Sequence, residues 1–70
     1  MSVYELSAEE IYDSYAPGID PAELLGQSRI DLATRLRVEE GLKQEEAYYA
    51  ADQMLAYARQ RVETQTIQNE

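Results

Sequence analysis

The sequence predicts an all-α protein, a small three-helix bundle with a long C-terminal helix, and three observations support this class. Two helix-start signatures follow each other in the first part of the chain. The second half carries apolar residues at intervals of three and four. No β-branched run alternates in the way of a strand. A chain of 70 residues has room for one domain, so we expect a single helical domain over residues 1–70.

The first helix start is a capping box. Ser7 stands at the N-cap and Glu10 three positions later, where its carboxylate can reach back to the N-cap amide. Leu6 and Ile11 occupy the two positions of a hydrophobic staple. The proline and glycine at 17–18 end this helix.

A second helix start follows at once in the segment 20–23, with aspartate at the N-cap and proline at the first helical position. Gly26 leaves two alternatives open. Either one helix runs on to Glu40, or a short extra helix near residues 21–26 ends there and a new helix begins at Ser28. We favour the second alternative, because the serine can cap a new helix.

A third helix is expected up to about residue 40. Leu32, Ala33 and Leu36 lie on one side of it, as in a helix that is buried on one face. Gly41 follows, and a glycine after the last turn is typical of a helix stop.

The last helix begins around residues 44–46 and continues to about Val62 or beyond. Its acidic start suits the positive end of the helix dipole. Its apolar stripe has helical spacing and consists of Ala47, Ala51, Met54, Leu55, Ala58 and Val62. The polar end, residues 64–70, is expected to fray.

The expected core is small for the chain that it must order. It consists of Leu24, Leu25, Leu32, Leu36, Leu42, Ala51, Met54, Leu55 and Ala58, with Ile11 and Tyr15 covering one end. Small domains are usually reinforced by disulfides, a metal or self-association. Because the sequence has no cysteine and no histidine, we expect a homodimer formed through the last helix.

The residues available for catalysis are few. With neither cysteine nor histidine, and with serines near helix starts, no nucleophile stands beside a general base in a known motif. Acid pairs such as Glu9 with Asp13, or Glu39 with Glu40, lack the glycine-kinked ligand series of a calcium loop. We therefore expect no enzyme activity, no cofactor and no metal.

The charge is strongly and unevenly acidic. Fourteen acidic residues against six basic ones give a formal net charge of -8, and no basic residue precedes Arg29. Such a surface repels nucleic-acid phosphates and attracts basic proteins.

Six tyrosines are the only aromatic residues. A tyrosine suits interfaces and half-buried positions alike, because it joins an apolar ring to a polar tip. We expect Tyr15 and Tyr48 in the core and Tyr12, Tyr49 and Tyr57 at the surface. The residues assigned to partner binding are Glu9, Glu10, Tyr12, Asp13, Tyr49 and Tyr57. The alternatives, acids that merely solubilise the first helix and tyrosines that merely pack, stay open.

A short segment carries a resemblance. The segment 35–47, about a fifth of the chain, resembles the start of Cro/C1-type helix-turn-helix repressors, whose first helix ends at Gly-Leu, here 41–42, before a Gln-Glu-Glu helix, here 44–46. The resemblance implies a DNA-binding regulator. The family has serine or threonine where this chain has Lys43, and it has a second turn and a recognition helix where residues 50–54 continue in helix.

These observations lead to three hypotheses of function. The first is a cytoplasmic, non-catalytic regulator or inhibitor that binds a larger protein through its acidic, tyrosine-bearing surface, as phage- or plasmid-encoded antagonists do. A nucleic-acid-mimicking inhibitor of a defence complex is a special case. The second is a structural or assembly subunit. The third is a degenerate helix-turn-helix regulator that uses Arg35 and Arg37, although the net charge argues against direct nucleic-acid binding. We expect the protein in the cytoplasm, because the sequence shows no long apolar stretch, no secretory signal and no cysteine.

Overall fold

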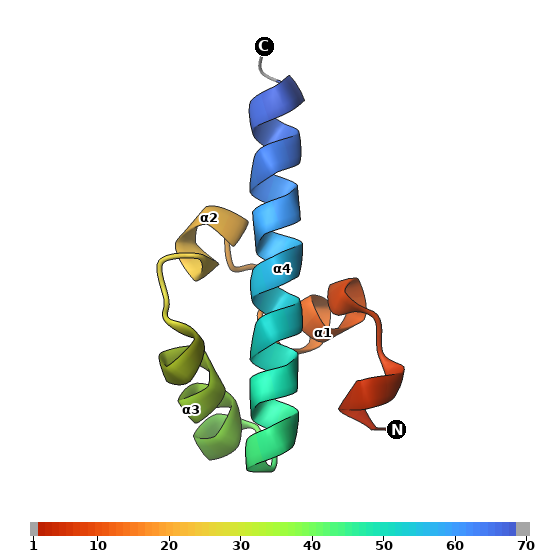
Figure 1. Ribbon diagram of the computed structural model, residues 1–70, viewed down its shortest axis with the longest axis vertical. Coiled ribbons are helices and arrows are strands. Elements are labelled where there is room, and N and C mark those ends of the chain that lie inside the picture. Colours follow the sequence, from red (N-terminus) through yellow and green to blue (C-terminus); the bar gives the residue numbers. More distant parts are fainter. Residues whose placement is uncertain (1, 69–70) are drawn as a thin grey trace.

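The computed structural model describes residues 2–68, with side chains for residues 2–64, and it confirms the all-α class. The elements in chain order are the 3-10 helix η1 (Val3–Glu5), α1 (Ala8–Tyr15), α2 (Pro21–Leu24), α3 (Arg29–Glu39) and α4 (Gln44–Gln68). No strand occurs among the described residues. The long C-terminal helix predicted by the sequence is α4, and it runs along the full height of the molecule (Figure 1).

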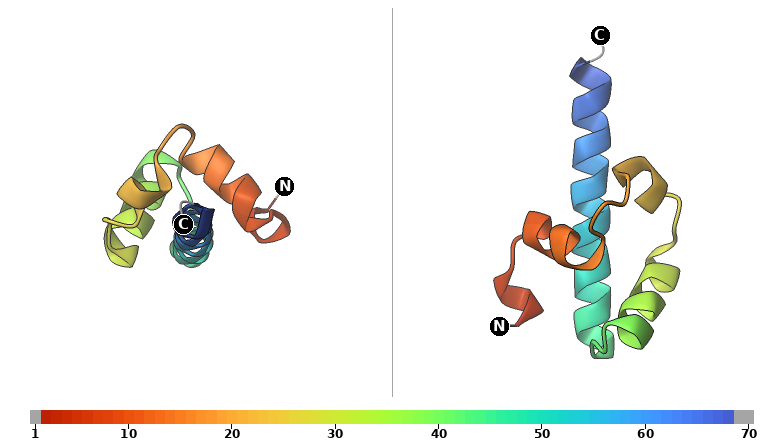
Figure 2. Two further views of the ribbon diagram at one scale, coloured as in Figure 1. Left: turned by 90° about the horizontal axis from the view of Figure 1, so that it is seen from above. Right: turned by 180° about the vertical axis from the view of Figure 1, so that it is seen from behind.

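α4 is the axis against which the other elements pack. Each extensive contact between elements joins α4 to α3, α1, α2 or η1. α1 lies on one side of α4, and α2 and α3 lie on the other (Figure 1). Seen along α4, the two sides form diverging arms with α4 in the opening between them (Figure 2). One long face of α4 is therefore uncovered, and the exposed residues Asp52, Ala56 and Glu63 lie along it.

The first helix starts where the sequence predicts. The Ser7 hydroxyl accepts a hydrogen bond from the Glu10 amide at 3.2 Å, and the Glu10 carboxylate accepts one from the Ser7 amide at 3.0 Å. At α2 the carboxylate of Asp20 accepts from the amide of Ala22 at 3.0 Å. Each cap satisfies a backbone donor that the helix leaves without a partner.

The break at Gly26 is confirmed. α2 ends at Leu24, and α3 begins after Ser28, whose hydroxyl accepts from the Asp31 amide at 3.1 Å. The glycine stop after α3 is confirmed as well, because Gly41 has a φ of +72°. A residue with a side chain is strained in that left-handed region, which is why glycine ends the helix there.

The core forms where α4 meets its neighbours. The expected core residues that are buried are Ile11, Leu24, Leu32, Leu36, Ala51, Met54 and Ala58. The other expected residues, Tyr15, Leu25, Leu42 and Leu55, are half-buried and pack against this core, so the three leucines are less buried than expected. These four lie at helix ends or on the flank of α4, where a single layer of helices does not cover a side chain completely.

Small residues contribute more to the core than the sequence suggested. Ala16 and Ala50 are completely buried, and Val3 is also in the core. An alanine lets two backbones approach closely, so a helix such as α4 can pack against several neighbours without large side chains between them.

The start of the chain differs from the expectation, whereas the extent of α4 agrees with an end at about Val62 or beyond. η1 was not predicted, although Ser2 and Glu5 form a second capping box around it, with the same spacing as the first. α4 continues to Gln68, beyond Val62. Fraying over 64–70 stays a prediction, and residues 69 and 70 lie outside the described part of the chain.

Candidate partner-binding surface

Two pairs of tyrosines in tilted ring contact join the N-terminal arm, residues 2–16, to α4. The ring centroids of Tyr4 and Tyr49 are 4.9 Å apart, and those of Tyr12 and Tyr57 are 5.1 Å apart. Both distances and the tilted ring planes are those of favourable aromatic pairs. The two tyrosines of the arm are eight positions apart in the sequence, and so are the two tyrosines of α4. We call these four residues the tyrosine seam.

Tyr12 corrects the expectation of an exposed side chain. It is only 6 % exposed, and its hydroxyl donates a hydrogen bond to the backbone carbonyl of Ile19. Burial raises the pKa of Tyr12, and the negative charge of Asp20 raises this pKa further. The residue lies five positions before the proline-glycine turn; its ring contacts Tyr57 of α4, and its hydroxyl reaches the chain beyond the turn. Tyr12 is therefore a core residue that cannot meet a partner directly.

The other tyrosines of the seam remain partly accessible. Tyr49 and Tyr57 are half-buried, and Tyr4 is 50 % exposed. Tyr4 was missing from the predicted site. Its signal in the sequence was the capping box around it, which marks the segment as ordered. Burial raises the pKa of Tyr4, and Glu45 and Glu46 raise it further, so acidic residues of α4 surround this ring.

The two remaining tyrosines, Tyr15 and Tyr48, lie outside the tyrosine seam. Both are half-buried, whereas we expected them in the core. The Arg29 guanidinium lies over the ring of Tyr48, 4.6 Å from its centroid, in a cation–π contact between α3 and α4. Tyr15 lines a small hollow between the arm and α3.

The acids of α1 divide into two kinds. The Glu10 carboxylate is part of the capping box, and its hydrogen bonds from the amide and hydroxyl of Ser7 lower its pKa. Glu9 and Asp13 are exposed and make neither a hydrogen bond nor an ion pair within residues 2–64. The structure therefore leaves two of the three predicted acids free for a partner and gives the third a structural role.

Capping uses carboxylates throughout the protein. The side chains of Glu5, Glu10, Asp20 and Glu46 each accept a hydrogen bond from a backbone amide at a helix start. Part of the acidic excess is thus explained by helix capping, because four of the five helix starts use a carboxylate.

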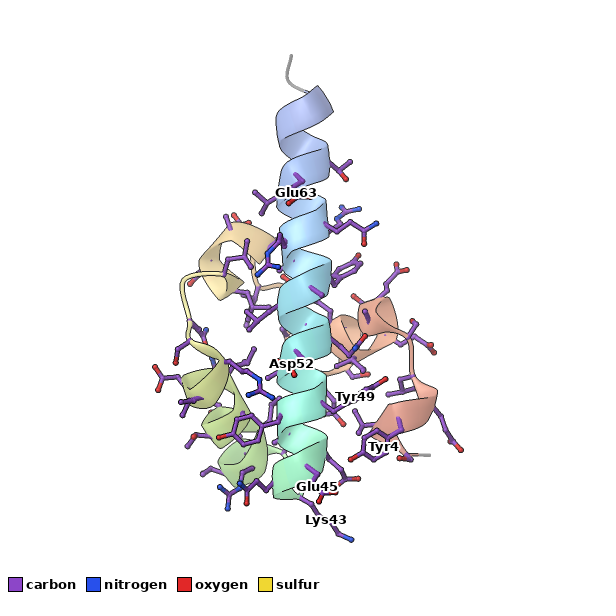
Figure 3. All side chains as sticks on the ribbon, in the orientation of Figure 1. Tyr4, Lys43, Glu45, Tyr49, Asp52 and Glu63 are labelled. Atoms are coloured by element: carbon purple, nitrogen blue, oxygen red, sulfur yellow. The ribbon has the colours of Figure 1, made fainter. Side chains whose placement is uncertain are left out.

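An open hollow lies at each end of the tyrosine seam. One is lined by Tyr4, Lys43, Gln44, Glu45 and Glu46. The other is lined by Ser7, Ala8, Glu9, Tyr57, Gln60, Arg61 and Thr64. Figure 3 shows Tyr4 and Tyr49 near the first hollow, with Lys43 and Glu45 at the start of α4. Glu9 thus shares a hollow with Tyr57, whereas Tyr49 belongs to the other end of the seam. The six predicted site residues therefore do not form one cluster.

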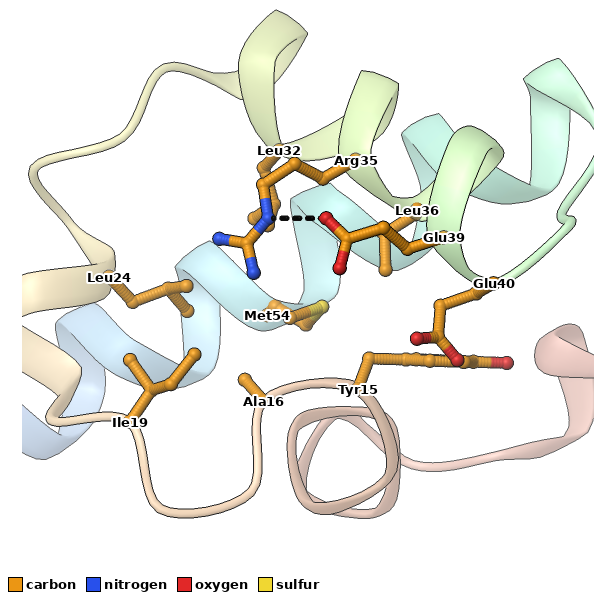
Figure 4. A pocket seen from close by; sticks show the side chains of 10 residues that line it. All are labelled: Tyr15, Ala16, Ile19, Leu24, Leu32, Arg35, Leu36, Glu39, Glu40 and Met54. Atoms are coloured by element: carbon orange, nitrogen blue, oxygen red, sulfur yellow. Dashed lines mark hydrogen bonds and ion pairs between the residues drawn. The ribbon is translucent and has the colours of Figure 1, made fainter.

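The hollow between α1 and α3 is too small for a ligand. Its volume is about 20 Å³, the room of about one water molecule. Figure 4 shows the Arg35–Glu39 ion pair at its rim, with a distance of 3.3 Å, over Leu32, Leu36 and Met54. We assign it to packing.

Two arginines of α3 make ion pairs, and one of them is Arg35 of the helix-turn-helix hypothesis. The guanidinium of Arg29 makes two contacts of 2.6 and 3.1 Å with the Asp52 carboxylate, and Arg35 pairs with Glu39. The α4 helix is continuous through residues 50–54, so up to residue 68 no second turn and no separate recognition helix follow the segment that resembles a repressor.

No group of three or more acidic, histidine or cysteine side chains is placed to hold a metal ion within the described part of the chain. Among the described helices, none combines the length and the apolar character needed to cross a membrane.

Comparison of the chain with protein-family models, with curated proteins and with solved structures finds no match.

Proposed function

We propose that this protein is a cytoplasmic, non-catalytic regulator or inhibitor that binds a larger protein through the face where its N-terminal arm meets α4. The observation that supports this proposal is the tyrosine seam, with an acid-bearing hollow at each end. The accessible rings offer apolar area, and the surrounding carboxylates offer negative charge.

The charge of the arm indicates the chemistry of the partner. Residues 2–16 contain Glu5, Glu9, Glu10 and Asp13 and no basic residue, so the arm carries four negative charges. A basic protein surface complements this field, and its approach is accelerated at low salt. Lysine and arginine side chains can also stack on tyrosine rings. We therefore propose a partner that presents a basic patch.

Mimicry of nucleic acid is a special case of this proposal. Because Glu10 caps α1, an imitation of phosphates on this helix depends on Glu9 and Asp13, which stand four residues apart and so lie on neighbouring turns. A partner that normally binds nucleic acid would then compete with it for this face.

The test is an affinity capture from host lysate at low and high salt, with Glu9→Gln/Asp13→Asn beside the wild type. The matched control is Glu23→Gln/Glu40→Gln, which removes two exposed charges away from the seam. We expect one large protein to be captured by the wild type and the control, and to be lost with high salt and with the first variant. Equal capture by both variants would refute the acidic surface as the binding site.

A structural or assembly subunit is the second candidate. Ile30 is 63 % and Val38 is 78 % exposed on α3. Exposed aliphatic side chains on one helix are typical of a surface that another protein covers permanently. If this second candidate is correct, the charge variants capture the partner as the wild type does, whereas substitution of Ile30 and Val38 reduces the capture.

A further inference from the structure

An oxidant that removes single electrons finds few targets in this protein other than tyrosine. Cysteine and methionine are the side chains that oxidants usually attack first. The chain contains no cysteine, and Met54 is only 1 % exposed. Tryptophan, which also gives up an electron readily, is absent. Because a phenol loses an electron far more readily than a thioether does, one-electron oxidation is directed to the six tyrosines.

Tyr4 and Tyr49 are placed to react with each other. Their ring centroids are 4.9 Å apart and the ring planes are tilted by 58°, so the two rings are in contact. Tyr4 is 50 % exposed, which gives an oxidant access to the pair. Neither hydroxyl takes part in a hydrogen bond within residues 2–64, so each ring is free to rotate about its side-chain bonds. Figure 3 shows the two side chains between η1 and α4.

We propose that Tyr4 and Tyr49 form an oxidative modification site, at which a one-electron oxidant joins the two rings as dityrosine and so links the N-terminal arm to α4. Each phenol gives one electron to the oxidant and its hydroxyl proton to water. The two radicals form a carbon–carbon bond between ring carbons next to the hydroxyl-bearing carbons. The hydrogen on each of these carbons then moves to the oxygen, which restores both phenols. A peroxidase with hydrogen peroxide supplies the oxidant, because one peroxide takes up the two electrons and two protons and becomes two water molecules.

The charges around Tyr4 favour its oxidation. Glu45 and Glu46 line the hollow beside this ring. Burial raises the pKa of Tyr4, and the negative charge of both glutamates raises it further. The same negative charge favours the removal of an electron, which leaves the ring more positive. Lys43 lines this hollow too, but the two carboxylates outnumber its single charge.

The other tyrosines are less suited to this reaction. Tyr12 is 6 % exposed and its hydroxyl is held by a backbone carbonyl, so its contact with Tyr57 is shielded and its ring cannot rotate freely. The Arg29 guanidinium lies 4.6 Å from the ring centre of Tyr48, and its positive charge opposes the loss of an electron. Tyr15 makes no ring contact with another tyrosine within residues 2–64. The chemistry therefore selects one pair among the six residues.

The link changes how firmly the arm is held. It closes a loop of 45 positions between Tyr4 and Tyr49. A covalent loop of this length restricts the unfolded chain, as a disulfide does, and so favours the folded state. In the linked protein the arm cannot leave α4. This inference does not rest on the proposed function, because the link is detected without a partner.

The experiment treats the full chain with a peroxidase and limiting hydrogen peroxide at a low and a high protein concentration. Dityrosine fluorescence follows the reaction, and the mass of the intact chain reports the loss of two hydrogen atoms. We expect a single chain with an internal link, located at Tyr4 and Tyr49 by fragmentation in the mass spectrometer. The yield per chain should not change on dilution, because the two rings belong to one molecule.

Two variants and a control identify the pair. Tyr4→Phe and Tyr49→Phe each remove a phenol and keep a ring, and no hydrogen bond within residues 2–64 is lost. Both should fold as the wild type does, judged by circular dichroism, and both should lose the internal link. Tyr57→Phe is the matched control and should keep it. The purified linked protein should unfold at a midpoint roughly 10 °C or more above that of the untreated protein.

Three results would overturn the inference. Links that form only between chains, with a yield that falls on dilution, exclude an internal site. An internal link that persists in Tyr4→Phe or in Tyr49→Phe belongs to another pair. A linked protein that unfolds at the same temperature as the untreated one shows that the link does not hold the arm in its folded position.

Discussion

The hydrogen bond from Tyr12 to the carbonyl of Ile19 joins α1 to the chain beyond its turn, and Tyr12→Phe removes it while keeping the ring that stacks on Tyr57. A typical intramolecular hydrogen bond contributes about 1 kcal/mol net. The Ile19 residue is half-buried, so its carbonyl can turn to water and the cost should stay near that value. For a domain of this size, about 1 kcal/mol lowers the midpoint of thermal unfolding by roughly 4–8 °C.

The assay is thermal unfolding followed by circular dichroism, with Tyr57→Phe as the matched control. The Tyr57 hydroxyl makes no hydrogen bond within residues 2–64, so we expect its removal to change the free energy of unfolding by less than about 0.5 kcal/mol. If both variants shift the midpoint equally, the hydrogen bond of Tyr12 does not stabilise the fold and the reasoning is refuted.

The burial of Tyr12 also predicts how the stability of the protein depends on pH. The folded protein holds the phenolic proton of Tyr12 more tightly than the unfolded chain does, because burial raises its pKa above the ordinary value of 10.0. This contribution is complete below about pH 10 and is lost as the pH rises through the raised pKa. Urea unfolding from pH 8 to about 11 should show a steeper loss of stability for the wild type than for Tyr12→Phe.

Two further predictions concern the core and the first helix cap. Leu55→Asp places a charge against the core and should abolish cooperative unfolding, whereas Ala56→Asp on the uncovered face should stay folded, both judged by circular dichroism; a soluble, cooperatively folded Leu55→Asp protein contradicts this. Ser7→Ala should cost about 1 kcal/mol, and Ser14→Ala, on the exposed side of α1, should cost nothing measurable. Because the hydrogen bonds from Ser7 lower the pKa of Glu10 below its ordinary 4.5, the stability that they provide is present above pH 4.5 and is lost as the pH falls. The free energy of unfolding of Ser7→Ala should therefore decrease less between about pH 5 and lower pH than that of the wild type. An equal decrease in both proteins would contradict the role of Glu10 in the cap.

Local signals in the sequence were sufficient for the helices and their ends. The capping boxes, the proline at the start of α2 and Gly41 act through contacts between residues a few positions apart, so they can be recognised without knowing the fold. The short helix α2 and the break at Gly26 followed from the same rules. The missed helix η1 had a capping box too, at Ser2 and Glu5, and a search for that motif would have found it.

The roles of the acids and tyrosines needed the tertiary structure. Acidic composition alone did not distinguish Glu10, which caps its own helix, from Glu9 and Asp13, which are free. Composition also placed Tyr12 at the surface, because its burial depends on Tyr57, which is 45 positions later in the chain.

The sequence by itself determined the all-α class, the helix boundaries and the net charge, since each depends on residue type and short-range spacing. Only the tertiary structure decided that α4 is the axis of the fold, that two tyrosine pairs fasten the arm to it, and that Ile30 and Val38 are left on the outside. The physical reason is that the packing of α4 against four neighbours selects which face of each short helix is covered. Contacts between distant segments, which no local pattern records, make that selection.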